Sequence, residues 1–396
     1  MTVRTSVIAG GAQSTAPRLV DVSTNQSGTA QVRRLDSLTG LRFLAAVAVF
    51  GFHASYLAAG PVADALQVVF GRGASGVGLF FVLSGFVLAW SARPTDTATR
   101  VWQRRAARIL PTYLVTWLVA GAAASWLIGE TPWRAGAANL LLVQAWIPRE
   151  SIYFGWNGPA WSLSCEAFFY LLLPLILPRV ARLSARDRLR LASALVAVDI
   201  GLTVVASIAT PREASVLDSR FGFVGWLVYI CPLGRLPEFV IGLLAASLVR
   251  DRQLPRVPVR MAVGLVAAAY AATYASAHFV VQVGVLLVPF ALLVVALAQR
   301  ELADGRSWLA GRRWVVLGEW SYAFYLIHHL LLQVAQRAVG EIGDVRAMAW
   351  VTVLLAATVL VAGALFRFVE RPAERRLRGA PARAMLAGDA PRRRRK

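Results

Sequence analysis

An arginine and a histidine interrupt an apolar run near the start of the chain. The stretch TGLRFLAAVAVFGFHAS, residues 39–55, would be accepted by a bilayer, except that Arg42 and His53 lie in it eleven positions apart. On an α-helix this spacing advances about three turns and roughly 16 Å, so both side chains share one face. Ionisable groups inside a membrane cost free energy and mark functional sites by default. His53 is therefore a candidate general base, the alternative being a histidine that only packs between helices.

A carboxylate opens a second apolar run. In WSLSCEAFFYLLLP, residues 161–174, Glu166 precedes an unbroken apolar stretch, so it must pair with a cation or stay protonated. We expect His53 to be its partner, because both residues lie toward the outer half of the bilayer. A carboxylate that fixes the imidazole tautomer and offsets its charge is what general-base chemistry on a hydroxyl needs. Trp161 and Ser162 begin the same run, and Trp161 would suit as a platform for a sugar ring.

Three arginines stand at the mouth of another predicted span. The stretch WQRRAARILPTY, residues 102–113, contains Arg104, Arg105 and Arg108, of which the last two share a helical face. Guanidinium groups suit phosphate oxygens, so the cluster predicts a phosphate clamp for a cytosolic donor such as a coenzyme A thioester. The alternative is that these arginines only set the orientation of the chain in the membrane.

A late apolar run also carries polar and ionisable residues. It reads LGEWSYAFYLIHHLLL, residues 317–332, and its candidate substrate contacts are Glu319, Tyr322, Tyr325 and His328. The neighbouring His328 and His329 point about 100° apart on a helix, so at most one of them can face the same cavity as Tyr325. No third ligand has suitable spacing for a metal ion, so we predict no metal site.

Small residues recur in the run GASGVGLFFVLSGFVLAW, residues 73–90. Gly76, Gly78, Ser84 and Gly85 would let a neighbouring helix approach closely. A glycine-lined path for an acyl chain or a pantetheine arm is the alternative function of these residues.

The composition indicates which elements hold these residues. Of the 396 residues 57% are hydrophobic and only 16% are charged, which is too apolar for a soluble domain and predicts an all-α polytopic membrane bundle. Spans that meet the requirement of about 20 apolar residues are predicted near 38–59, 76–92, 109–128, 160–178, 190–209, 234–249, 259–277, 279–298, 314–336 and 347–369. The segment 137–147 is predicted to be interfacial or re-entrant, and 221–232 is ambiguous.

The distribution of basic residues predicts the topology. The chain has 42 Lys and Arg against 21 acidic residues, and with the N terminus inside 32 of the basic residues fall on the inner side and 7 in the outer loops. This asymmetry follows the positive-inside rule and places both termini in the cytoplasm. Because no basic face with interleaved aromatic residues is present, we do not expect nucleic-acid binding.

The chain divides into three parts. Residues 1–34 read as a disordered cytoplasmic leader, residues 35–372 as one transmembrane domain, and residues 373–396 as a basic cytoplasmic tail. With two cysteines, Cys165 and Cys231, the chain has too few for a disulfide framework, and we expect both to be buried. The use of 41 arginines and one lysine resembles GC-rich bacteria, which suggests a bacterial cytoplasmic membrane.

Six motifs in order, from LDSLTGLRFLAAVAVFGFHAS to LGEWSYAFYLIHH, resemble the acyltransferase 3 family of multi-pass membrane O-acyltransferases. The resemblance implies a ten-helix bundle that passes an acyl group, commonly acetyl, from cytosolic acyl-CoA to a hydroxyl. It implies acceptors such as cell-envelope sugars or glycosylated small molecules including macrolides, and no permanently bound cofactor. The motif residues carry over to Arg42, His53, Arg105, Arg108, Trp161, Ser162, Glu166, Ser321, Tyr322, Tyr325 and His328.

These residues support one mechanism and leave alternatives open. We expect His53, oriented by Glu166 or another buried partner, to deprotonate an acceptor hydroxyl that attacks a thioester. Arg104, Arg105 and Arg108 would hold the phosphates of the donor, while Arg42 assists them or steadies the oxyanion. An acyl-histidine intermediate, a secondary transporter that uses the same ionisable residues, and a silent membrane scaffold are the alternatives.

Overall fold

The computed structural model describes residues 33–56, 58–93, 95–128, 132–211, 221–305, 307–340 and 342–377. Most of these residues form α-helices: α1 (Asp36–Ala54), α2 (Gly60–Phe70), α3 (Gly76–Ser91), α4 (Ala98–Ile128), α5 (Trp133–Leu140), α6 (Glu150–Tyr153), α7 (Trp161–Arg182), α8 (Ala185–Ala209), α9 (Gly222–Tyr229), α10 (Pro232–Arg250), α11 (Val259–Thr273), α12 (Val281–Leu302), α13 (Arg312–Val339) and α14 (Asp344–Leu365). Two short strands, β1 (Ala58–Ala59) and β2 (Ile342–Gly343), pair in parallel.

The prediction of an all-α polytopic membrane protein is confirmed. Within the described ranges, nine helices are long and apolar enough to cross a bilayer. The seventh predicted span, 259–277, forms α11, whose 15 residues fall short of the length of about 20 that a crossing needs. The ambiguous segment 221–232 contains α9 and joins α10 in one candidate span, Gly222–Arg250.

The predicted ends of the chain are only partly within the described residues. Residues 1–32 of the predicted leader and residues 378–396 of the predicted tail lie outside them. Residues 373–377, the first of the predicted tail, are helical and follow a π-helical turn at Phe366–Glu370.

The segment 132–160 folds back into the bundle without crossing it, as predicted for 137–147. It consists of short helical pieces, and its last residues contact the middle of α13. The side-chain amide of Asn157 donates to Leu326 O at 3.0 Å, and the hydroxyl of Tyr325 donates to Pro159 O at 3.0 Å. Because Tyr325 lies midway along the 28-residue α13, α7 begins at the middle of the bundle, not at its surface.

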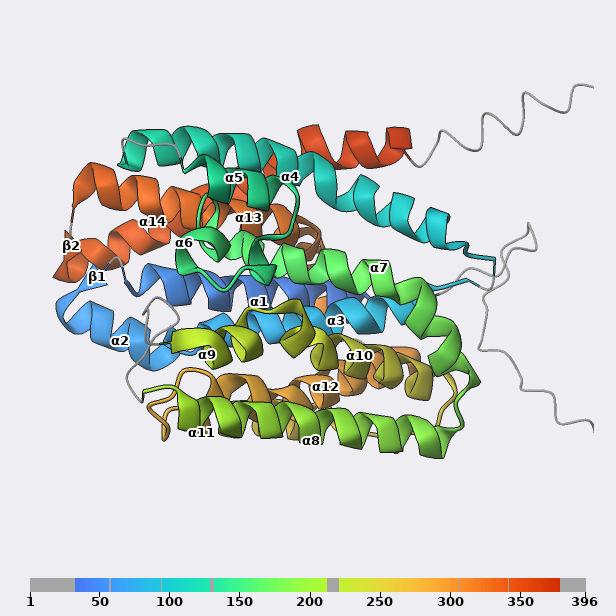
Figure 1. Cartoon of the computed structure of the whole chain (residues 1–396). Coiled ribbons are helices and arrows are strands. Elements are labelled where there is room, and N and C mark those ends of the chain that lie inside the picture. The colour runs from blue at the N-terminus through green and yellow to red at the C-terminus, as the bar shows by residue number, and fades with distance from the viewer. Residues whose placement is uncertain are drawn as a thin grey trace, which may run out of the picture. The chain divides into compact units, whose positions relative to one another are not determined.

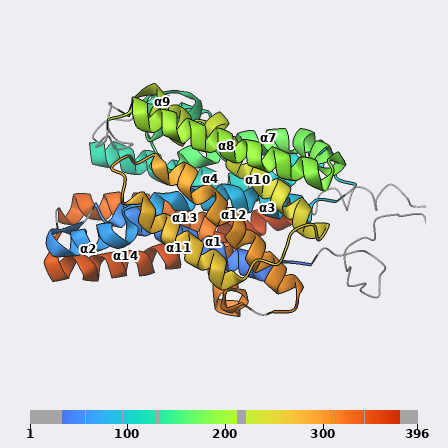
Figure 2. The same ribbon diagram turned by 90° about the horizontal axis from the view of Figure 1, so that it is seen from below.

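Helices α1 and α13 run in the same direction and pack along much of their length. Near their starts Gly318 lies against the backbone of Thr39, where a Cβ atom would collide with Thr39 O. α1 and α3 lie between α4, α13 and α14 on one side and α8, α10, α11 and α12 on the other (Figure 1). α2 and α14 lie side by side at the end where α1 finishes (Figure 2), and there β1 and β2 pair.

Glycines permit the close crossing of α3 and α10. A Cβ atom on Gly85 would collide with Phe239 O of α10, and one on Gly242 would collide with Val82 O of α3. Each helix thus places a glycine against the backbone of the other, and the two backbones are in direct contact, as small residues allow in membranes. The packing function that we preferred for Gly85 is thus the one found.

The Gly85→Val variant should therefore lose stability. The added side chain has no space unless α3 and α10 separate, and overpacking of this kind costs about 1–3 kcal/mol or more. Thermal unfolding of the detergent-solubilised protein would measure the loss. Gly264→Val is the matched control, because nothing lies within 4 Å of a Cβ at Gly264. Equal stability of the two variants would contradict the proposed role of the crossing.

Candidate active site

Three histidines from two helices meet at one cavity. The ring of His53 lies 5.1 Å from that of His328 and 4.7 Å from that of His329, measured between centroids. His53 and His329 line a cavity of about 340 Å³, whereas His328 is completely buried behind them. The prediction that only one of the paired histidines faces a cavity with Tyr325 is confirmed, but that residue is His329, which the motif did not single out.

The hydrogen bonds of these rings assign their tautomers. Nδ1 of His328 lies 2.7 Å from Tyr325 O, and a carbonyl only accepts, so His328 Nδ1 carries a proton. Nε2 of neutral His328 is then an acceptor, and Nδ1–H of His53, 3.1 Å away, donates to it. The same Nδ1 of His53 also lies 3.0 Å from Val49 O. Nε2 of His53 is left with its lone pair and has no hydrogen-bond partner within the described ranges. His53 is thus set up to accept a proton.

Glu166 does not orient His53, contrary to the sequence-based expectation. His328 occupies that position, and Glu166 lines a second cavity on the side of the bundle where α1 begins. The reason is that α7 begins inside the bundle and not at its surface. Because α7 begins midway along α13, Glu166 lies too deep to reach the end of α1 and faces Arg42 and Arg105 instead.

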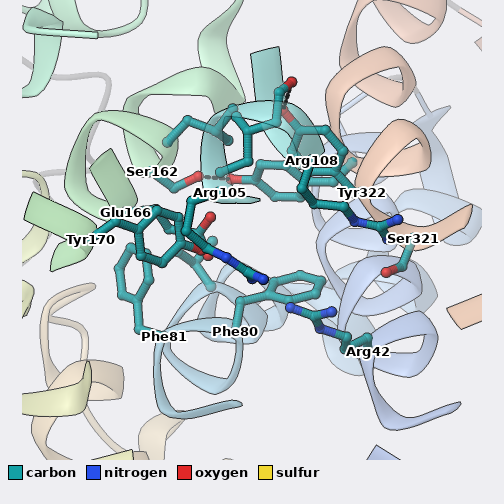
Figure 3. Close-up of a pocket in the computed structure, with 14 residues that line it drawn as sticks. Arg42, Phe80, Phe81, Arg105, Arg108, Ser162, Glu166, Tyr170, Ser321 and Tyr322 are labelled. Carbon is teal, nitrogen blue, oxygen red and sulfur yellow. Dashed lines mark hydrogen bonds between the residues drawn. The ribbon is translucent and has the colours of Figure 1, made fainter. Parts of the chain in front are cut away.

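The second cavity, which we call the arginine cavity, has a volume of about 90 Å³. Arg42, Arg105 and Arg108 all project into it, together with Glu166 and Tyr170 (Figure 3). Arg42 makes no hydrogen bond or ion pair with another residue of the described chain, so its guanidinium is available to a bound anion. The cavity thus presents an excess of positive charge, which suits phosphate or a developing oxyanion.

The three arginines of α4 have different surroundings. Arg105 lines the arginine cavity, and Arg108 does so while pairing with Glu370 at 2.5 Å and Glu374 at 3.5 Å. Arg104 is outside this cavity and pairs with Asp96 at 2.6 Å, so the structure separates it from the predicted phosphate clamp. The sequence did not predict that Glu370, in the π-helical turn, pairs with Arg108. The two residues are 262 positions apart, so no local sequence pattern connects them.

A narrow boundary separates the arginine cavity from the histidine cavity. Val77 and Tyr325 line both. The hydroxyl of Tyr325 is fixed there by Ser162 Oγ at 2.9 Å and by Pro159 O at 3.0 Å. A substrate that reaches from one cavity to the other has to pass these two side chains.

Three more of the predicted residues line one cavity or the other. Trp161 lines the histidine cavity, whereas Ser162 and Tyr322 line the arginine cavity. Glu319 is not among the residues that line either one, although we predicted a substrate contact for it. Across the described ranges, no group of three or more His, Cys, Asp or Glu side chains is arranged to hold a metal ion.

Comparison with known proteins agrees with the resemblance noted in the sequence. The family model described as an acyltransferase domain matches residues 35–367. Acyltransferase MdmB of Streptomyces mycarofaciens is 38% identical over 366 residues, which cover 88% of this chain and 93% of that protein. Exopolysaccharide production protein ExoZ of Rhizobium meliloti (strain 1021) is 29% identical over 340 residues, covering 80% of this chain and 95% of that protein. No solved structure matches the chain.

Proposed function

The chain belongs to the acyltransferase 3 family, and we propose that it transfers a short acyl group from acyl-coenzyme A to a hydroxyl of a sugar. The sugar belongs to a cell-envelope glycan or to a glycosylated small molecule such as a macrolide. The names of both relatives support this proposal, since they concern acyl transfer and exopolysaccharide production and not solute transport.

The unpartnered Nε2 of His53 is the observation that carries the proposal. This nitrogen takes the proton of the acceptor hydroxyl while the oxygen attacks the thioester carbonyl. The carbon–sulfur bond then breaks, and the leaving thiolate recovers the proton from His53. Nδ1 of His53 keeps its hydrogen bonds to His328 and Val49 throughout, so the imidazolium is stabilised as it forms.

The arginine cavity is assigned to the donor. Arg105 and Arg108 hold phosphate groups of coenzyme A, and Arg42 interacts with the thioester end. At about 340 Å³ against about 90 Å³, the histidine cavity is the larger, so we assign the bulkier sugar ring to it. The acyl end of the donor passes between Val77 and Tyr325 to reach His53.

This assignment fixes an orientation in the membrane. Acyl-coenzyme A is made in the cytoplasm, so the end of the bundle with the arginine cavity faces inward in a bacterial cytoplasmic membrane. The excess of basic residues in the loops at that end supports the same orientation.

Acyl transfer by the purified protein tests the proposal. The full-length protein in lipid nanodiscs is incubated with acetyl-coenzyme A labelled in the acetyl group and with a set of neutral methyl glycosides. We expect one labelled sugar ester for each coenzyme A thiol that is released. Absence of any labelled ester, with the protein folded and the glycosides in excess, would refute the function.

A further inference from the structure

A stripe of polar residues leads out of the histidine cavity along α13. His329, Gln333 and Gln336 are spaced four and three residues apart, so they share one face of this helix. The stripe runs toward the end of α13, away from the arginine cavity. Polar side chains on an otherwise apolar membrane helix are retained where they face a cavity or a ligand.

The outer part of this stripe lines a further hollow of about 710 Å³, separate from the arginine cavity. Phe154, Gln333 and Gln336 line both this hollow and the histidine cavity, so the two are neighbours. Residues of α4, α6 and α13 and of the loop after α6 form its other walls, which include Glu150, Ser151, Trp156 and Arg337. We call this hollow the outer groove.

The polar groups of the stripe are not used within the protein. The side-chain amides of Gln333 and Gln336 form no hydrogen bond with any residue of the described ranges, and Nδ1 of His329 is buried without a partner there. Leaving the buried nitrogen of His329 without a hydrogen bond costs free energy, and the amides of half-buried Gln333 and exposed Gln336 face the hollow. They are therefore ready for a ligand that offers several donors and acceptors close together.

We propose that Gln333 and Gln336 bind the sugar of the acceptor, which enters through the outer groove and presents its hydroxyl to His53. Each amide both donates and accepts, which matches neighbouring hydroxyl groups on a pyranose ring. Trp156 and Phe154 supply apolar faces for the ring. Because Glu150 and Arg337 have opposite charges, the groove fits a neutral sugar better than an acidic one. This inference rests on the proposed function and names the class of its acceptor.

The test compares kinetic constants for the two substrates in the nanodisc assay described above. Gln333→Leu and Gln336→Leu each remove the hydrogen-bonding amide and keep a side chain of similar size. We expect each change to raise KM for the methyl glycoside about tenfold, as the loss of one or two hydrogen bonds predicts. KM for acetyl-coenzyme A should stay within about twofold, because these residues lie outside the arginine cavity.

Ala338→Leu provides the control on the same helix, since Ala338 is exposed and lines neither hollow. Wild-type transfer with an unchanged glycoside KM in both Gln variants would overturn the groove assignment and leave the proposed function intact. Preference of the wild type for acidic over neutral glycosides would overturn the acceptor class. Absence of transfer by the wild type would refute the proposed function and the inference together.

Discussion

Replacing His53 with alanine should lower acyl transfer by about 10²–10⁴-fold, the range that a general base contributes. His53 is the ring whose Nε2 is left free by the hydrogen bonds from Nδ1 to His328 and Val49. Because the imidazole is half-buried and faces a cavity, its removal should leave the helices packed. The rate of labelled ester formation under saturating substrates is the measurement, with gel filtration of the variant as the check on folding.

The fourth histidine of the chain supplies the matched control. His278 lines neither the histidine cavity nor the arginine cavity, so His278→Ala should keep transfer within about twofold of the wild type. Full activity of His53→Ala would remove the general base from the mechanism. Label retained on the wild-type protein before acceptor is added, but absent from His53→Ala, would instead favour an acyl-histidine intermediate.

Replacing Arg105 with alanine should raise KM for acetyl-coenzyme A by about 10- to 100-fold, while KM for the glycoside changes little. One charge-assisted hydrogen bond to a phosphate contributes about 1.5–3 kcal/mol, and about 1.4 kcal/mol corresponds to a factor of ten. Arg108 is less suited to this test, because its removal would leave the carboxylate of Glu370 unpaired and buried. Initial rates at varied donor concentration measure the effect.

Arg104→Ala is the control for this experiment. Arg104 is adjacent in sequence but pairs with Asp96 outside the arginine cavity, so its loss should alter the donor KM by less than about threefold. Equal effects of the two substitutions would mean that general positive charge at this end binds the donor, and the specific assignment of Arg105 would fail.

The fold was largely predictable from the sequence, because hydropathy and charge act through local stretches. The ten apolar runs all form helices, and the segment 137–147 does not cross the bundle. The shared face of Arg42 and His53 also follows from helix geometry, although their side chains serve two cavities and not one. The length of α11 was overestimated, since hydropathy alone does not reveal where a helix ends.

The pairing between helices was not predictable in the same way. The partner of His53 was expected to be Glu166 because both residues were placed near the outer surface. Their true depths depend on how far the segment before α7 folds inward, and this is decided by contacts of Asn157 and Pro159 with α13. The choice between His328 and His329 likewise depends on the rotation of α13 about its own axis, which no local pattern fixes.

The boundary that Val77 and Tyr325 form between the two cavities also bears on how the membrane keeps ions apart. If cavities that open to opposite sides of a membrane protein formed one continuous channel, ions would flow through it. The ion gradients that drive respiration would then be lost. The two hydrogen bonds of the Tyr325 hydroxyl hold this side chain between the two cavities. An enzyme that works as we propose, with a charged nucleotide from one aqueous phase and a sugar from the other, needs such a barrier so that it does not become a leak for protons or sodium.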